Sequence, residues 1–397
     1  MRIAVLAWDL PPHGSGLGRA AMEIARSLAR AGNDVTVFES GRTYGETVVD
    51  QGMLIVGCSP PRNSSIRFLR ERAMIGHLVA PWYFCKAVQA AHKAIPFDII
   101  EATNWYAPAA FLSLGATPLV VRNSTPAIDA KCGAHRLRQN VDLWFAHQLE
   151  KLTARQASGL ISNTPSHAEL IENIYGIGNH PLHQVVSLAL DENVLTRGAM
   201  APLPSTKGPQ SLLFVGRAER RKGFNEFLGG FAQVNRARGA AGRMPINLTT
   251  IGIDELDIRD HLEDQGENIT ILNSLSDDDL YTEFERATAV IAPSRYESFG
   301  LVYREAAAFG RPLITCAEDP AAKDFMQMAK CGILAESCTP LAIAKAIKQL
   351  LEQSEKWEEY ALNGRRHVQR LTTDNLATQT LAVYIEAIRL DAEKAVR

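Results

Sequence analysis

The sequence carries few signs of a secreted, membrane-spanning or metal-binding protein. Its six cysteines include no C-x-x-C pair and its ten histidines no H-E-x-x-H, so neither a disulfide framework nor a zinc site is expected. The longest uncharged apolar stretch, residues 73–85, is shorter than the roughly 18 residues of a transmembrane helix. The apolar run at the N-terminus ends at Asp9, too early for a secretory signal. We therefore expect a cytoplasmic protein with reduced thiols.

An excess of charge of one sign is also missing. Lys and Arg number 42 and Asp and Glu number 44, which gives a formal charge of −2. No global basic field is available to attract nucleic acid. The hydrophobic fraction of 46% and the charged fraction of 22% are typical of globular proteins. At about 150 residues per domain, the length predicts two or three domains.

The first 40 residues predict a βαβ unit. Residues 3–7 form a continuous apolar run, which is typical of a parallel strand covered on both faces. A loop containing Gly14, Ser15 and Gly16 follows, and then a helical pattern with apolar residues at 17, 20, 21, 24, 25, 28 and 29. Residues 34–38 are the next strand. Such a unit indicates a doubly wound sheet that binds ligands at the carboxyl ends of its strands.

This pattern recurs along the chain. Further strands are predicted at 97–101, 118–121 and 159–162, and a linker-like change of composition lies at 198–210. Strands follow at 211–217, 247–252, 269–272, 289–292 and 312–315, and residues 375–397 have a helical pattern. We predict an α/β protein with two doubly wound Rossmann-like domains that face a central cleft. The domains span residues 1–190 and 191–370, and residues 371–397 form a terminal helix.

Residues 215–223 have the features of a phosphate site. A strand ends, the cations Arg217 and Lys222 follow, and a helix begins. A helix N-terminus offers free N–H groups and the cations neutralise negative charge, so the segment suits a diphosphate. The alternative interpretation is a solvated basic loop.

Residues 293–305 have a second such pattern. Glu297 lies in a predicted loop and Glu305 two turns into the helix that follows. Between them, the backbone N–H groups near Phe299, Gly300 and Leu301 could bind an anion while the carboxylates accept hydroxyl groups. The alternative interpretation is that a Glu near a helix start merely complements the helix macrodipole.

Together these features resemble the retaining glycosyltransferases of family 4, also called group 1, which have the GT-B fold. The resemblance covers nearly the whole chain. It rests on the Gly-rich first loop, on Val215-Gly216-Arg217 with Lys222-Gly223, on Glu297 to Glu305 as an E-x7-E motif, and on the small-residue stretch 307–314. It implies a retaining, metal-independent transferase without a cofactor. The enzyme would move a hexose-type sugar from a nucleotide-diphosphate sugar, UDP- or GDP-linked, to a hydroxyl acceptor that is a glycan, a lipid-linked acceptor or a small molecule.

The resemblance also implies residue roles. Gly16 would let the backbone approach the phosphate or sugar of the donor. Arg217 and Lys222 would bind the diphosphate and stabilise it as it leaves, which is where fixed cations are most effective. Glu297 would hold hydroxyls of the transferred sugar, and Glu305 those of the ribose.

The resemblance places further donor contacts and relates the two domains. The first domain would be the acceptor side and the second would bind the donor, with the terminal helix packing back on the first domain. The amides of Phe299, Gly300 and Leu301 would meet phosphate, and the base would lie near Leu272, Asn273 and Leu275. The D-x-D at Asp277-Asp278-Asp279 is better explained as the first turn of a helix capped by Ser276 than as a metal site.

Two departures from the family pattern concern the donor sugar. Ser15 stands where many members have a glycine, and its hydroxyl could contact the ligand or restrict its approach. Many members carry a His after the strand at 118–121, but here Arg122 and Asn123 follow. Either of these side chains is a candidate for a sugar or acceptor contact.

Two other activities remain as alternatives. A nucleotide-sugar 2-epimerase would share the fold. An NAD-dependent oxidoreductase would use Gly14 and Gly16 for the dinucleotide and Glu39 for the ribose, but Arg19 stands where the third glycine of that fingerprint belongs.

Residues 62–86 suggest peripheral contact with the inner face of a membrane. A core helix followed by an acceptor-side loop explains the segment equally well. The basic residues are Arg62, Arg67, Arg70, Arg72 and Lys86, and the apolar ones are Ile66, Phe68, Leu69, Met74, Ile75, Trp82, Tyr83 and Phe84.

Overall fold

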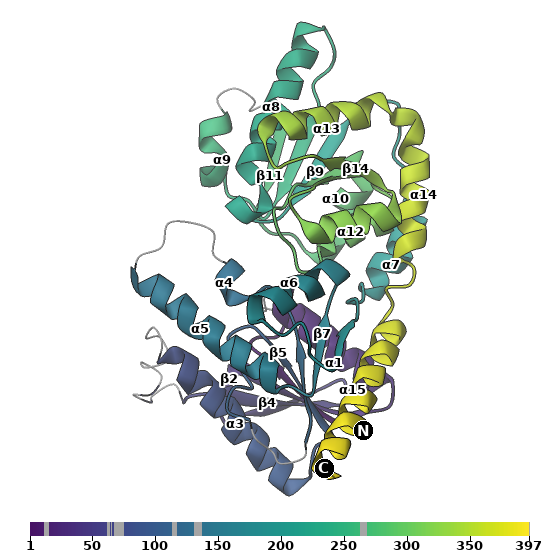
Figure 1. The fold of residues 1–397 in the computed structure, drawn as a ribbon. Coiled ribbons are helices and arrows are strands. Elements are labelled where there is room, and N and C mark those ends of the chain that lie inside the picture. The colour runs from purple at the N-terminus through teal and green to yellow at the C-terminus, as the bar shows by residue number, and fades with distance from the viewer. Residues whose placement is uncertain are drawn as a thin grey trace. The chain divides into compact units, whose positions relative to one another are not determined.

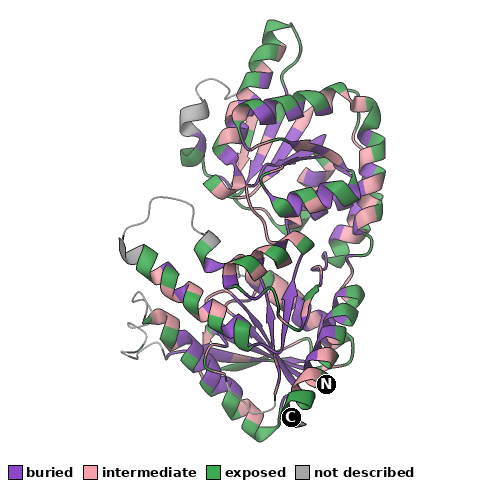
Figure 2. Cartoon of the chain, viewed as in Figure 1, coloured by how far each residue is buried: buried purple, intermediate pink, exposed green. Residues whose placement is uncertain are grey.

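The computed structural model describes residues 1–11, 16–61, 64, 66, 75–112, 117–130, 137–262 and 268–396. The chain divides into two compact units (Figure 1). Unit 1 comprises Met1–Ala189 and Thr373–Arg397, and unit 2 comprises Leu190–Thr372. In both units the strands are buried at the centre while the outward faces of the helices are exposed (Figure 2). This distribution is that of parallel sheets covered on both faces.

Unit 1 is built on a sheet whose described strands have the order β3-β4-β2-β1-β5-β6-β7-β8. Every neighbouring pair is parallel except the hairpin of β3 and β4. That hairpin turns at Gln51 and Gly52, which both have positive φ, as a two-residue hairpin turn requires. The strands are β1 (Arg2–Ala7), β2 (Asp34–Thr43), β3 (Thr47–Asp50), β4 (Met53–Ser59), β5 (Ile99–Thr103), β6 (Leu119–Arg122), β7 (Gly159–Ser162) and β8 (His183–Val185).

Helices cover this sheet, and the last helix of the chain is one of them. They are α1 (Gly16–Arg30), α3 (Gly76–Ala94), α4 (Ala127–Ala130), α5 (Leu137–Gln156), α6 (Pro165–Tyr175) and α15 (Thr373–Val396). Phe84 and Val88 of α3 belong to one hydrophobic cluster with Ala4 and Leu6 of β1. The terminal helix α15 packs against α1, β6 and β7. The Tyr384 hydroxyl of α15 donates to Glu101 Oε2 at 2.6 Å, so buried polar contacts as well as apolar ones hold this helix in unit 1.

Unit 2 contains a parallel sheet whose described strands have the order β11-β10-β9-β12-β13-β14. The strands are β9 (Ser211–Val215), β10 (Asn247–Ile251), β11 (Ile269–Leu272), β12 (Ala289–Ala292), β13 (Leu313–Cys316) and β14 (Gly332–Ala335). The helices are α7 (Glu192–Met200), α8 (Phe224–Ala240), α9 (Glu255–Leu262), α10 (Asp277–Arg286), α11 (Leu301–Ala308), α12 (Pro320–Ala329), α13 (Pro340–Glu352) and α14 (Trp357–Val368), with short 3₁₀ turns at η1 (Arg220–Lys222) and η3 (Ser354–Lys356).

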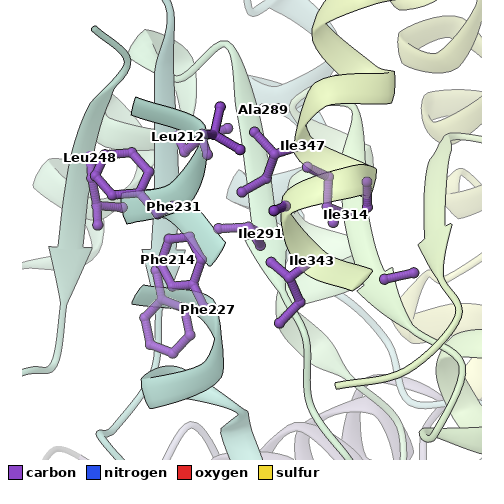
Figure 3. Packing of buried hydrophobic residues seen from close by; sticks show 14 of the residues in the cluster. Leu212, Phe214, Phe227, Phe231, Leu248, Ala289, Ile291, Ile314, Ile343 and Ile347 are labelled. Atoms are coloured by element: carbon purple, nitrogen blue, oxygen red, sulfur yellow. The ribbon is translucent and has the colours of Figure 1, made fainter. Parts of the chain in front are cut away.

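The core of unit 2 lies between this sheet and the helices α8 and α13 (Figure 3). The rings of Phe214 on β9 and Phe227 on α8 are stacked, with centroids 5.7 Å apart. A Cβ atom on Gly230 would lie 2.8 Å from the Pro340 carbonyl oxygen, so only glycine allows α8 to approach α13 this closely. This packing fixes the start of α8 and therefore the loop between β9 and α8.

Candidate active site

Most of the site residues predicted from the sequence lie along one edge of the unit 2 sheet, where the carboxyl ends of its strands meet. The strand order makes the segments that follow β11, β10, β9 and β12 neighbours. Backbone hydrogen bonds connect them. Gly216 N–H donates to the Ile251 carbonyl at 2.9 Å, and Gly252 N–H donates to the Leu272 carbonyl at 2.9 Å. Because open parallel sheets bind ligands at the carboxyl ends of their strands, this edge is the candidate site.

Glu297 is the centre of a charged cluster on this edge. Lys222 Nζ donates to Glu297 Oε1 at 2.6 Å, Arg221 Nη1 lies 3.1 Å from the same oxygen, and Ser294 Oγ donates to it at 2.9 Å. Burial alone would raise the pKa of Glu297, but the two cations and the hydrogen bonds hold it below its ordinary value. The carboxylate is therefore ionised at neutral pH. Among the described residues these contacts all fall on Oε1, so Oε2 can accept a hydroxyl of a ligand.

Asp319 fixes the backbone of Glu297. The Glu297 N–H donates to Asp319 Oδ1 at 3.1 Å, and the Tyr303 hydroxyl donates to Asp319 Oδ2 at 2.7 Å. Asp319 also caps α12, because Ala321 N–H donates to Oδ1 at 3.1 Å. One buried carboxyl thus joins the Glu297 loop to helices α11 and α12. Its burial, with the nearby charge of Glu297, raises its pKa to about 7 although the donors act to lower it.

The raised pKa of Asp319 predicts a pH-dependent stability. The unfolded chain releases this proton near pH 4, whereas the folded chain keeps it to about pH 7, so the folded state binds more protons between these values. The contribution of Asp319 to the free energy of unfolding therefore falls as pH rises through this window. Between pH 5 and 7 we expect the free energy of unfolding of wild type to fall by up to about 3 kcal/mol relative to that of Asp319→Asn. Denaturant unfolding of both proteins at each pH measures this, and parallel pH curves would contradict the assignment.

The start of α11 offers free backbone donors. Gly300 has φ 73° and precedes the helix, and a Cβ atom there would lie 2.3 Å from the Tyr303 ring, so the turn requires glycine. Within the described part of the chain, the N–H groups of Phe299, Gly300 and Leu301 donate to no carbonyl or side chain. Free N–H groups at the start of an α-helix form a binding site for an anion such as phosphate.

Arg304 holds the carbonyl groups of this loop. Its guanidinium carbon lies 3.7 Å from the centroid of the Phe299 ring, and Nη1 donates to the carbonyl oxygens of Phe299 and Gly300. Burial lowers the pKa of Arg304 to about 9, which still leaves it charged at neutral pH. Because Arg304 engages the carbonyl groups from inside the unit, the amides of the same peptides remain available to a ligand.

Arg217 and Glu305 are the remaining predicted residues of this edge. The Arg217 side chain is 74% exposed and pairs with Glu219 at 2.9 Å. Such an exposed ion pair is weak, so Arg217 can reorient toward a ligand. Glu305 is half-buried in the second turn of α11. The structure brings Lys222 directly to Glu297, whereas the ion pair of Arg217 is with Glu219.

The stretch predicted to lie near the base lines a pocket. This pocket has a volume of about 430 Å³ and lies where β10 and β11 end. Its lining residues are Asp254, Glu255, Leu256, Ile271, Leu272, Asn273, Ser274 and Leu275. The prediction for Leu272, Asn273 and Leu275 did not include the two carboxylates, which come from the segment after β10.

The predicted residues of unit 1 lie elsewhere. Gly16 is the first residue of α1. Among the described residues, apart from its chain neighbours and its own helix backbone, no atom lies within 4 Å of a Cβ atom built on it. Ser15 falls outside the described residues. Arg122 is buried, donates to Glu101 at 2.8 Å and 3.1 Å and to Thr380 of α15 at 2.8 Å. These contacts place Arg122 in the interior as an anchor for α15. Its Nη1 has no partner among the described atoms, and a sugar or acceptor contact by Arg122 stays a prediction.

Asn123 is likewise buried, with 1% of its surface exposed. Its side-chain nitrogen donates to Ser162 Oγ at 3.1 Å, which connects the ends of β6 and β7. Its side-chain oxygen has no partner among the described atoms. A ligand contact by this oxygen stays a prediction.

The acidic triplet that follows β11 forms the first turn of α10, which Ser276 caps, as the sequence indicated. Ser276 Oγ accepts a hydrogen bond from Asp279 N–H at 3.2 Å at the start of α10. Among the described residues, no group of three or more His, Cys, Asp or Glu side chains is arranged to hold a metal ion. Within the same residues, no helix combines the length and the hydrophobicity needed to cross a membrane.

Several residues of the site escaped the sequence analysis. They are Arg221, Ser294, Tyr303, Arg304 and Asp319. Asp319-Pro320 has the signature of a helix start, and that signal predicts the cap of α12. The contact of its carboxyl group with Glu297 joins residues 22 positions apart, which no local pattern predicts.

The fold defines the class of the protein. It has two α/β units built on parallel sheets, as GT-B glycosyltransferases do, and one unit has cations and free amides at the carboxyl ends of its strands. Two family models match the chain, "Glycosyl transferases group 1" over residues 199–367 and "Glycosyl transferase 4-like domain" over residues 15–186. The chain belongs to the group 1 glycosyltransferases and is a transferase enzyme, which sets the NAD-dependent oxidoreductase aside.

Named relatives agree with this assignment. The chain is 26% identical to glycogen synthase of Mycobacterium tuberculosis, over 98% of the chain and 95% of that protein. Sucrose-phosphate synthase from Thermosynechococcus elongatus superimposes with a TM-score of 0.76 at 18% identity, over 98% of this chain and 99% of the other. The catalytic domain of starch synthase IV from Arabidopsis thaliana, bound to ADP and acarbose, gives a TM-score of 0.67 at 12% identity, over 98% and 99%.

Proposed function

We propose that this protein transfers a hexose from a nucleotide-diphosphate sugar to a hydroxyl acceptor, with retention of the anomeric configuration and without a metal. Unit 2 binds the donor and unit 1 provides the acceptor side. The observation that carries the proposal is the ionised Glu297 held by Lys222 and Arg221 next to the free amides that start α11. A related fold that binds ADP and acarbose supports a nucleoside diphosphate and a sugar as ligands.

The charges of the site match those of the reaction. The bond between the anomeric carbon and the diphosphate oxygen breaks, so positive charge develops on the sugar and negative charge on the leaving group. Lys222, Arg217 and the amides of residues 299–301 stabilise the leaving diphosphate without needing to reorganise. Glu297 Oε2 accepts hydroxyls of the transferred sugar, and Glu305 accepts those of the ribose.

Retention follows from attack on the face that the diphosphate leaves. The acceptor oxygen bonds to the anomeric carbon, and its proton passes to an oxygen of the departing phosphate. No protein nucleophile is needed, and Glu297 is already engaged by two cations, which lowers its nucleophilicity. The cations that hold the phosphate also fix the oxygen that receives the proton.

The direct test is product analysis with a panel of nucleotide sugars and simple sugar or sugar-phosphate acceptors. NMR should show one new glycosidic linkage with the anomeric configuration of the donor, and EDTA should leave the rate unchanged. An inverted product would overturn the retaining mechanism. Release of nucleoside diphosphate with an epimerised free sugar would instead favour the nucleotide-sugar 2-epimerase.

Peripheral membrane contact stays a prediction, because residues 62–63, 65 and 67–74 lie outside the described part of the chain. On α3, however, Leu78 and Trp82 are 40% and 49% exposed. Lys86 Nζ lies 5.6 Å from the Trp82 ring centroid. An exposed indole beside a cation suits the interface of an anionic bilayer.

We expect the protein to sediment with anionic phospholipid vesicles, because indole burial and cation attraction act together there. Leu78→Ser with Trp82→Ser should reduce the bound fraction severalfold. Ile385→Ser is the control. Ile385 is 61% exposed on α15, so this substitution removes one surface apolar group elsewhere in the chain. Equal sedimentation with neutral and anionic vesicles, or no effect of the double substitution, would count against membrane contact by α3.

A further inference from the structure

The pocket at the ends of β10 and β11 has the chemistry of a site for one particular base. We infer that it binds guanine, so that the donor is a guanosine-diphosphate sugar. This inference rests on the proposed function, because it assumes that the site binds a nucleotide. It goes further in that it names the base and the two carboxylates, Asp254 and Glu255, that select it.

The position of the pocket fits the base end of a nucleoside diphosphate. In the order β11-β10-β9-β12, the pocket lies at the ends of β11 and β10, the cations follow β9, and the Glu297 loop follows β12. Strands lie about 4.8 Å apart, so the site extends for about 14 Å along the sheet edge. A base, a diphosphate and a sugar can therefore lie in sequence from the pocket to Glu297.

The walls of the pocket suit the faces of a purine ring. Leu256, Ile271, Leu272 and Leu275 supply apolar side chains, and the volume of about 430 Å³ admits a two-ring base. Apolar walls with a few polar groups are the usual form of a small-molecule site, in which the polar groups provide the selectivity. The identity of those polar groups therefore decides which base fits.

The polar groups of the pocket favour a base with two adjacent hydrogen-bond donors. Guanine presents two neighbouring donors, the N1–H and the exocyclic amino group, and one carboxylate can accept both. Uracil and thymine present one N–H between two carbonyl oxygens, and adenine presents its amino group next to an acceptor nitrogen, so a carboxylate meets a lone pair in each. The pocket lining contains Asp254 and Glu255 and no Lys or Arg.

These carboxylates are available to a ligand. Among the described residues, neither the Asp254 nor the Glu255 side chain makes a hydrogen bond or an ion pair. Both residues are exposed at the start of α9. Acidic residues in a first turn also complement the helix macrodipole, but that role requires no pocket and gives no preference among bases.

Calorimetric titration with GDP, UDP and ADP tests the inference on the full-length protein. We expect wild type to bind GDP on the order of 10- to 100-fold more tightly than UDP or ADP, as a well-placed bidentate contact allows. Asp254→Asn combined with Glu255→Gln should remove that preference by weakening the binding of GDP, whereas the binding of UDP should not weaken. Glu352→Gln is the control for charge, because it removes one exposed carboxylate from the same unit. The melting temperature of each variant without ligand reports whether it folds.

The outcomes separate this inference from the function on which it rests. Tighter binding of UDP or ADP by wild type would overturn guanine selection and leave nucleotide-sugar transfer in place. A GDP preference that survives in the double variant would overturn the assignment to Asp254 and Glu255. If wild type bound none of the three diphosphates, the proposed function itself would fail.

Discussion

Replacing Lys222 with Ala should lower kcat/KM by on the order of 10²-fold or more, and Arg217→Ala should do the same. Each change removes a cation that stabilises the diphosphate as its negative charge grows, an effect that is stronger in the transition state than in the ground state. Both variants should also bind the nucleoside diphosphate product less tightly. Steady-state kinetics with a saturating acceptor, together with calorimetric titration of the diphosphate, measure the two effects.

The structure distinguishes these variants by a second property. Arg217 makes only an exposed pair with Glu219, so Arg217→Ala should leave the stability of the protein within about 0.5 kcal/mol of wild type. Lys222→Ala removes one of the two cations next to the buried Glu297, so the pKa of Glu297 should rise toward its ordinary value. Lys345→Ala, an exposed lysine of α13, controls for the loss of one charge in unit 2. If Arg217→Ala and Lys222→Ala both kept full activity, the diphosphate assignment would be wrong.

The fold was predictable because its strands are buried on both faces. The run at residues 3–7 and those at 211–215 and 289–292 carry almost no polar residues, and the structure places all three at the centres of sheets. The charged cluster was only partly predictable. Lys222 and Glu297 were found because each belongs to a motif, but their contact at 2.6 Å joins segments 75 residues apart.

The residues that support these motifs have no local signal. Arg304 follows an ordinary helical pattern, and only the fold of the 299–300 turn brings two carbonyl oxygens onto its guanidinium. Arg122 shows the converse. It ends β6, and no local pattern indicates that its guanidinium donates to Thr380, which is 258 residues away. Long-range contacts decide which polar groups at a strand end are free for a ligand.

Glu297→Gln and Glu305→Gln should differ in which kinetic constant changes. Glu297 is held by Lys222 and Arg221 with Oε2 left for the transferred sugar, whose ring distorts and gains positive charge during the reaction. A hydrogen bond and a negative field at that ring strengthen in the transition state, so Glu297→Gln should chiefly lower kcat. In the proposed function Glu305 contacts the ribose, which does not change during transfer. That contact would be uniform binding, so Glu305→Gln should chiefly raise the KM for the donor.

Donor titrations at saturating acceptor distinguish the two roles. The neutral amide in Glu297→Gln leaves two half-buried cations without their anion, so the melting temperature and far-UV circular dichroism of this variant must first show that unit 2 is folded. Glu305→Gln, in the second turn of α11, is the matched charge-neutral substitution on the same motif. A Glu297→Gln enzyme that changed only in KM, with a Glu305→Gln enzyme that changed only in kcat, would reverse the assignment.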